Sequence, residues 1–144
     1  MGLSGAAFLM GMIGRKAHVA RLKRLSGPTM EREVGKALFA AGNRVQVAAQ
    51  ISITAGAVSG KGHVPSTAPN PPNNDTGVLA GNIETIQTAP LVVEVRSNAP
   101  YSAALEFGTS RMAARPFMQP AIDAERKNVE QLVFQAVKRA TKRR

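Results

Sequence analysis

Few side chains in this sequence have the types and spacing that catalysis requires. The two histidines, His18 and His63, have no acid or nucleophile at a recognisable spacing, although a catalytic triad or a two-histidine metal site would need such partners. The chain has no cysteine, so thiolate ligands and cysteine nucleophiles are excluded. Its nine carboxylates are scattered, without a pair suited to general acid–base chemistry. We therefore expect no enzyme activity, no catalytic residue, no metal site and no cofactor.

The sequence also contains no motif typical of a phosphate-binding loop and no segment typical of a membrane span. Gly60-Lys61-Gly62 lacks the Walker spacing and is followed by proline-rich sequence rather than by a helix. No apolar run approaches the roughly 20 residues that span a bilayer. The apolar stretch 6–13 is followed by its positive charges, which is the reverse of a secretory signal. We expect no membrane partner.

The basic residues are concentrated at the two ends of the chain. The net charge is +10, and residues 1–30 carry five Lys or Arg without an acid, as do residues 138–144. Between them, nine basic side chains balance nine acidic ones. We interpret 1–25 and 138–144 as the basic ends of a neutral body. The alternative hypothesis, a small basic nucleic-acid-binding protein, assigns phosphate contacts to Lys138, Arg139, Lys142, Arg143 and Arg144.

The first third of the chain predicts two helices. Ile13, Val19, Leu22 and Leu25 lie close to helical spacing, which predicts a short amphipathic helix over 13–25. Ser26-Gly27-Pro28 then predicts a break and a restart, because proline suits the first turn of a helix. An apolar stripe at three- and four-residue steps predicts a second helix over 29–53, weakened slightly by Gly35 and Gly42.

Residues 56–76 differ in kind from the helices before them. Gly, Pro, Ser and Asn dominate this segment, and no periodicity remains. A loop of this length inside one domain is usually functional or disordered. Two hypotheses stay open: an arm laid across a neighbouring subunit, or an ordinary surface loop.

The second half of the chain begins with a predicted hairpin. NIETIQT (82–88) is β-prone, and LVVEVR (91–96) alternates apolar and charged residues over two faces. Ala89-Pro90 lies between the two segments, and proline suits the end of a strand. Residues 101–107 then predict a short helix that stops at Gly108.

The C-terminal part predicts a long helix. Residues 115–120 are expected to be extended, because both prolines disfavour a helical residue before them. Pro120 begins the final helix, whose expected apolar face includes Ile122 and Val129 and whose last turns are basic. The fold class is therefore α+β, with a small antiparallel sheet (hairpin 82–96) packed against long N-terminal and C-terminal helices in a single domain, 1–144.

One segment before the hairpin is more specific than a plain loop needs. Asp75-Thr76-Gly77 can form a tight turn in which Asp75 accepts backbone N–H bonds and Gly77 takes positive φ. Leu79 and Ile83 would then anchor the segment in the core. An ordinary turn before a strand is the alternative.

A second segment, Tyr101–Ala121, is equally specific. It contains the only tyrosine and two of the five phenylalanines. Glu106 lies among these aromatics, and a buried carboxylate needs a partner, for which Arg111 and Arg115 are close enough in sequence. We interpret the segment both as a rigid corner that joins hairpin to final helix and as a rim of subunit contacts.

The order of these two segments resembles that of a known protein family. The run Asn98-Ala99-Pro100-Tyr101, LEFGTSRM (105–112) and RPFMQPA (115–121), after the Asp75-Thr76-Gly77-x-Leu79 turn, is similar to the head–tail connection and tail-completion proteins of long-tailed bacteriophages. The resemblance covers about 70–121, a third of the chain. Residues 1–50 match less well, so we expect the N-terminal helices to be specific to this phage or phage-like particle.

The resemblance implies a structural virion subunit without enzyme activity. It implies a ring of identical copies, six being the expected number, at the neck or upper tail, assembled in the host cytoplasm. Expected partners are sister subunits, the adjacent phage connector, and tail-tube or tail-terminator proteins, with DNA only in passage. The residues assigned to subunit contacts or to the structural motif are Asp75, Thr76, Gly77, Leu79, Tyr101, Glu106, Phe107, Gly108, Thr109, Arg111, Arg115, Pro116, Phe117 and Pro120.

Overall fold

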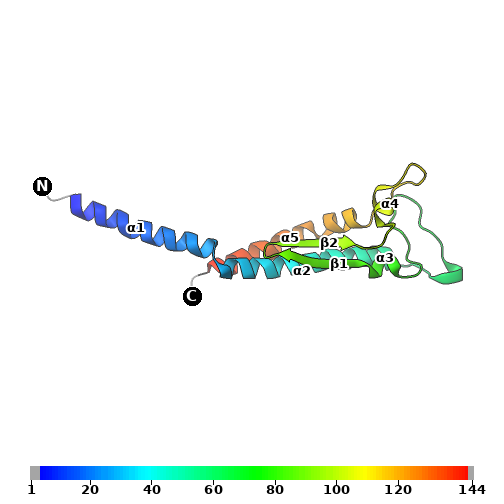
Figure 1. Ribbon diagram of the computed structural model, residues 1–144, viewed down its shortest axis with the longest axis horizontal. Helices are drawn as coiled ribbons and strands as arrows, with labels where there is room; N and C mark the ends of the chain where they lie inside the picture. Colours follow the sequence, from blue (N-terminus) through cyan, green and yellow to red (C-terminus); the bar gives the residue numbers. More distant parts are fainter. Residues whose placement is uncertain (1–3, 143–144) are drawn as a thin grey trace.

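Two long antiparallel helices and a hairpin form the body of the protein. A computed structural model describes residues 4–142, with side chains described from residue 14 onwards. Its elements are α1 (Ser4–Leu25), α2 (Pro28–Thr54), the 3-10 turn η1 (Gly60–Gly62), α3 (Val78–Gly81), β1 (Ile83–Ala89), β2 (Val92–Ser97), α4 (Ser102–Phe107) and α5 (Met118–Thr141). In Figure 1, α5 runs beside α2 in the opposite direction and the hairpin lies against α2. The predicted α+β class is confirmed.

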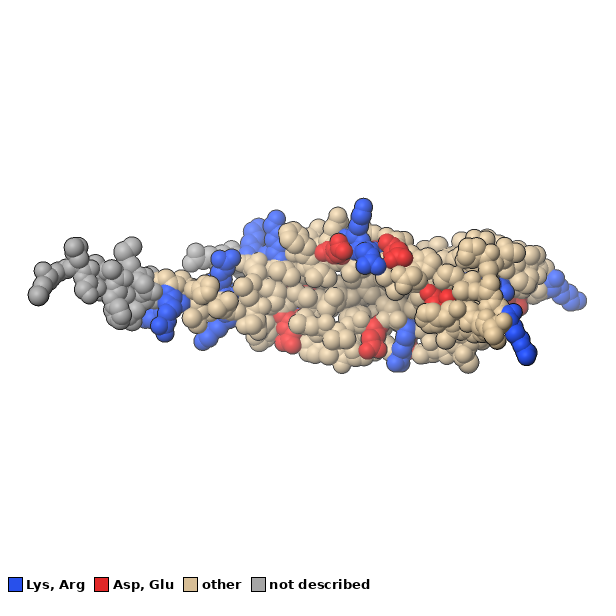
Figure 2. Space-filling view, turned by 90° about the horizontal axis from the view of Figure 1, so that it is seen from above, with Lys and Arg blue, Asp and Glu red and all other residues tan. Residues whose placement is uncertain are grey.

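α1 extends from one end of this body, beside the end of α5 (Figure 1). It begins nine residues before the predicted start at residue 13. Val19, Leu22 and Leu25 are each 40–49% exposed, so the apolar side of the helix has little cover within the chain. The Ile13 side chain, also assigned to that side, lies outside the described residues. Figure 2 shows that Lys and Arg gather at this end of the molecule.

α2 is the helix on which the rest of the body packs. Pro28 occupies its first turn, where the missing N–H costs nothing, and Glu31 lies in the same turn, where the helix dipole favours an acid. Its buried side is mostly alanine and glycine, with Met30, Val45 and Ile53 as the larger side chains. The predicted helix over 29–53 is confirmed, one residue longer at each end.

The hairpin forms within a residue of the predicted position. Its register places Glu84 opposite Arg96, and the Arg96 Nε donates to Glu84 Oε1 over 3.0 Å. The Asn98 side chain donates to the same oxygen. The hydrogen bond from Asn98 and, to a smaller extent, the one from Arg96 hold the pKa of Glu84 below its usual value. Polar interactions between side chains therefore link the two strands on the face of the hairpin that carries Glu84 and Arg96.

The opposite face of the hairpin packs on two glycines of α2. A Cβ built on Gly42 would lie 2.7 Å from Thr85 Cγ2 and 2.9 Å from Val93 Cγ1. A Cβ built on Gly35 would lie only 2.5 Å from the Pro90 carbonyl oxygen. Sequence reasoning assigned these glycines only a small cost in helix stability. The structure shows that they let the strands approach the helix closely.

Gly35→Ala is expected to lower the free energy of unfolding by about 1–3 kcal/mol, although alanine adds roughly 1 kcal/mol of helix propensity. The reason is that the new methyl group would meet a backbone oxygen, which cannot rotate away as a side-chain tip can. Urea unfolding followed by circular dichroism would measure the change. Gly81→Ala is the matched control, since nothing lies within 4 Å of a Cβ at that position. Equal stability of the two variants would contradict this packing.

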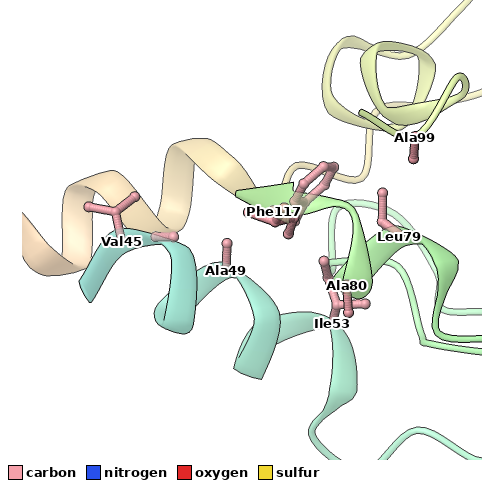
Figure 3. Close-up of a cluster of buried hydrophobic side chains, with 9 residues drawn as sticks. Val45, Ala49, Ile53, Leu79, Ala80, Ala99 and Phe117 are labelled. Atoms are coloured by element: carbon pink, nitrogen blue, oxygen red, sulfur yellow. The ribbon is translucent and has the colours of Figure 1, made fainter. Parts of the chain in front are cut away.

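The largest cluster of buried side chains lies at the end of the body opposite α1. Phe117, Ile53 and Ile83 are the largest side chains that are almost fully enclosed. Figure 3 shows Phe117 and Leu79 close to the last turns of α2, which contribute Ala49 and Ile53. Five elements or connections therefore meet here: α2, α3, β1, the segment before α4 and the start of α5.

α5 begins at Met118, two residues before the predicted start at Pro120. Of its expected apolar face, Val129 packs against the core, whereas Ile122 is 41% exposed and Ala121 is buried in its place. An ion pair joins α5 to α2, because Arg44 Nε donates to Glu125 Oε2 over 2.7 Å. This bond, together with one from Asn128, lowers the pKa of Glu125. None of the described helices is long and apolar enough to cross a bilayer.

Candidate functional site

The corner between hairpin and final helix is organised by Glu106. This residue lies in the last turn of α4, and its carboxylate accepts three backbone N–H bonds from the start of α5. Phe117 N and Met118 N donate to Oε2 over 2.8 and 3.0 Å, and Gln119 N donates to Oε1 over 2.9 Å. The first N–H groups of a helix have no partner within it, and the helix dipole favours an anion there. Glu106 therefore caps α5 from another element.

This arrangement corrects the predicted pairing of Glu106 with arginines. Within the described residues, no ion pair of Glu106 with Arg111 or Arg115 is present. The carboxylate has no need of one, because three N–H groups already satisfy it. Arg115 instead reaches the long loop, where its Nη1 donates to the Ser66 carbonyl oxygen over 3.0 Å. Its backbone N–H donates to the Leu105 carbonyl over 2.7 Å.

A tight turn follows α4 and depends on Gly108. This glycine has φ +73°, and a Cβ on it would lie 2.9 Å from both Met112 O and Ala114 N. Thr109 and Met112 exchange backbone hydrogen bonds of 2.8 and 3.3 Å, and Thr109 Oγ1 accepts the Arg111 N–H. The Arg111 side chain is exposed at the tip of this turn. No other residue type fits at 108 without strain.

The aromatic residues of the corner divide between inside and outside. Phe117 is 1% exposed and belongs to the core, whereas Phe107 is 82% exposed and Tyr101 45% exposed. Phe107 and Ile122 flank an open groove of about 560 Å³ between β2, α4 and the start of α5, whose lining also includes Val95, Ser97, Ser102, Pro116 and Met118. Pro120 is exposed in the first turn of α5. The corner thus presents apolar surface beside a groove.

The first motif behaves partly as the sequence indicated. Gly77 has φ +81° and precedes α3, and both Leu79 and Ile83 are buried anchors. Asp75 does accept a backbone N–H, but from Gly60, fifteen residues earlier, over 2.9 Å. Thr76 is exposed. The Asp75-Thr76-Gly77 motif therefore both holds the long loop, through Asp75, and begins α3, through Gly77. The contact with the loop could not be predicted from the local sequence pattern.

The structure brings the two motifs together around a small hollow. About 300 Å³ lies between Asp75 and Leu79 on one side and Tyr101 and Arg115 on the other, with His63 from the long loop at its edge. Among the described residues no group of three His, Asp or Glu side chains could hold a metal ion. Loop and corner are thus one unit, joined through Arg115 and Ser66.

Arg115→Gln is expected to release the loop and to raise the rate of tryptic cleavage after Lys61 by about tenfold, because a hydrogen bond from a charged donor contributes on the order of 1.5 kcal/mol to closure. Lys61 is the only Lys or Arg between 56 and 76. Mass spectrometry would separate this cut from cuts at the basic ends. Arg111→Gln is the control, and equal cleavage of both variants would show that Arg115 does not hold the loop.

The helices that carry the two basic segments of the chain also lie in contact at one end of the body, which the sequence did not indicate. Lys138, Arg139 and Lys142 are exposed around the end of α5, close to the last turns of α1. A hollow of about 450 Å³ there is lined by Arg21 and Arg24 of α1 and Thr141 of α5, among others. Arg143 and Arg144, also assigned to nucleic-acid contact, lie outside the described residues.

One family model matches the chain over residues 16–108, well over half of its length, and is described as "Bacteriophage HK97-gp10, putative tail-component". The chain belongs to the HK97-gp10-like family. The predicted resemblance to head–tail connection and tail-completion proteins is thereby confirmed. No curated protein and no solved structure matches the chain.

The extent of the HK97-gp10-like match corrects one expectation. It includes all of α2 and the second half of α1, so the expectation that 1–50 is specific to this phage is wrong for residues 16–50. It also includes the Asp75-Thr76-Gly77 turn and α4 with Glu106 and Phe107. The HK97-gp10-like match ends at Gly108, before the turn at Thr109 and the start of α5.

Proposed function

We propose that this tail-component protein is a structural subunit that forms a homo-oligomeric ring, with six copies expected, at the phage neck or upper tail. The ring joins the head connector to the tail tube or tail terminator and leaves a passage for DNA. The observation that carries the proposal is the exposed Phe107 beside the groove at the corner. Exposed aromatic anchors next to a concavity are typical of protein–protein contacts.

The rigidity of the corner supports this assignment. Glu106 fixes α4 to α5 through three hydrogen bonds, and Gly108 fixes the turn that follows. Phe107, between these two residues, is therefore held on a pre-formed surface, and a pre-formed surface loses little entropy when it binds. We assign no catalytic role to the corner. The long loop, tied to the same corner by Arg115, is proposed as an arm on a neighbouring copy.

Light scattering across protein concentration, followed by negative-stain images, tests the proposal. Self-association into one closed size, with ring-shaped particles, is the expected result. The same sample is then mixed with a purified connector complex, because a ring can also assemble on its docking partner. Monomers both alone and on the connector would overturn the ring.

A further inference from the structure

α1 carries four of its five basic side chains on one side. At about 100° per residue, Lys16, Arg21, Lys23 and Arg24 fall on this basic side together with Ala17 and Ala20, whereas Arg15 falls on the other side among Val19, Leu22 and Leu25. Ala17, Arg21, Arg24 and Leu25 line the hollow beside Thr141. Three of these four residues belong to the basic side, which therefore faces the end of α5, where three more cations are exposed.

Within the part of the chain that the structure describes, no acid neutralises this concentration of charge. Residues 14–30 and 131–142 contain no acid. The C-terminal ends of α1 and α5 contribute about −0.5 charge each through the helix dipole, which leaves most of the charge of Arg21, Arg24, Lys138, Arg139 and Lys142 unbalanced. We call these five residues the basic end. Like charges that a fold brings together without acids favour binding of an external anion.

A second copy of the chain does not fit this surface. On the face that Figure 2 shows, the acids lie singly along the body rather than in a patch. Glu33, Glu84, Asp123 and Glu125 already have ion-pair partners, and Glu106 caps α5. The other described acids, Glu31, Asp75, Glu94 and Glu130, lie on α2, the long loop, β2 and α5, so they form no acidic group that complements five cations.

We infer that the basic end binds the phosphate backbone of duplex DNA, without reading its sequence. Clustered Lys and Arg along a helix are the electrostatic feature of phosphate binding. One exposed aromatic side chain, Phe134, lies one turn before Lys138 on α5, so the basic end presents mainly cations rather than the row of aromatic side chains on which single strands stack. The inference rests on the proposed function in one respect, since a ring around DNA would present several basic ends to it.

Fluorescence anisotropy of a short labelled duplex with the full-length chain tests the inference. Five phosphate contacts predict a slope of about −4.5 for log K against log salt, so doubling the salt weakens binding about 20-fold. Arg21→Gln/Arg24→Gln on α1 and Lys138→Gln/Lys142→Gln on α5 are each expected to reduce the slope by about 2. Lys61→Gln/Lys127→Gln removes the same charge from exposed positions elsewhere and is expected to leave the slope unchanged.

Each other outcome overturns the inference. An unchanged salt slope in either double variant would show that α1 and α5 do not form one DNA-binding surface. An equal reduction of the slope in the control variant would show that only the net charge of the protein matters. If polyglutamate or anionic vesicles bound as tightly as DNA, the ligand of the basic end would be an acidic protein or a membrane surface rather than DNA. Light scattering of the same samples separates the two proposals. Rings that do not bind DNA would contradict only the DNA-binding inference, and DNA binding by a protein that stays monomeric would contradict only the proposed ring.

Discussion

Replacing Glu106 by alanine is expected to lower the free energy of unfolding by about 3 kcal/mol, more than an ordinary helix cap contributes. Three backbone N–H groups would lose their acceptor, and one of them belongs to the buried Phe117. The negative charge at the start of α5 would be lost as well. The corner and the start of the final helix would loosen together.

Urea unfolding followed by circular dichroism would measure this change. Glu106→Gln keeps one carbonyl oxygen as an acceptor and is expected to fall between the parent and the alanine variant. Glu130→Ala, at an exposed position of α5, is the matched control and should change stability by less than about 0.5 kcal/mol. If Glu106→Ala were as mild as Glu130→Ala, the carboxylate would not be the cap.

Phe107→Asp is expected to weaken self-association by at least about 30-fold, which corresponds to the 2 kcal/mol typical of an interface hot spot. The fold should be unaffected, because this side chain is 82% exposed and contributes little to the core. A charge at the centre of a desolvated contact is costly to bury. The result would therefore be a folded monomer at concentrations where the parent assembles.

Sedimentation velocity would give the assembly state, and thermal unfolding measured at a concentration where both proteins are monomeric would give the stability. Phe134→Asp makes the same substitution at a 68% exposed position of α5, outside both the corner and the long loop, and serves as the control. If Phe107→Asp assembled at the same concentration as the parent, Phe107 would not belong to the interface. Loss of assembly only in Phe134→Asp would move the contact to that side of α5.

Periodicity in the sequence was sufficient to locate the main elements. The stripe from Met30 to Ala49 gave α2 within one residue, and the alternation in 91–96 gave β2 within one residue. α1 was predicted too short, because its first ten residues are rich in glycine and alanine and carry no amphipathic pattern. α3 was missed, since a single turn of helix has no period to detect.

The contacts of the site could not be read in the same way. The sequence identified Glu106, Arg115 and Asp75 as special but assigned wrong partners to Glu106, because backbone N–H groups leave no mark in a sequence. Ser66 and Gly60, the partners of Arg115 and Asp75, lie 49 and 15 residues away in a segment without periodicity. The contact between α1 and the end of α5, which brings the basic N-terminal and C-terminal segments close together, depends on the antiparallel packing of α2 and α5. No local sequence pattern specifies that packing.

The uneven distribution of large side chains gives the molecule a gradient of local stability along its length. Phe117, Ile53 and Ile83 are enclosed at one end, whereas the buried side chains nearer the other end are mostly small, namely Ala37, Ala41 and Ala136, with Met30 as the larger one. Opening free energies follow the apolar area that is buried locally. Backbone amide hydrogens near the junction of α1 and α2 will therefore exchange with solvent before those of the corner. That half of the subunit can adapt its shape during assembly while the corner keeps its structure.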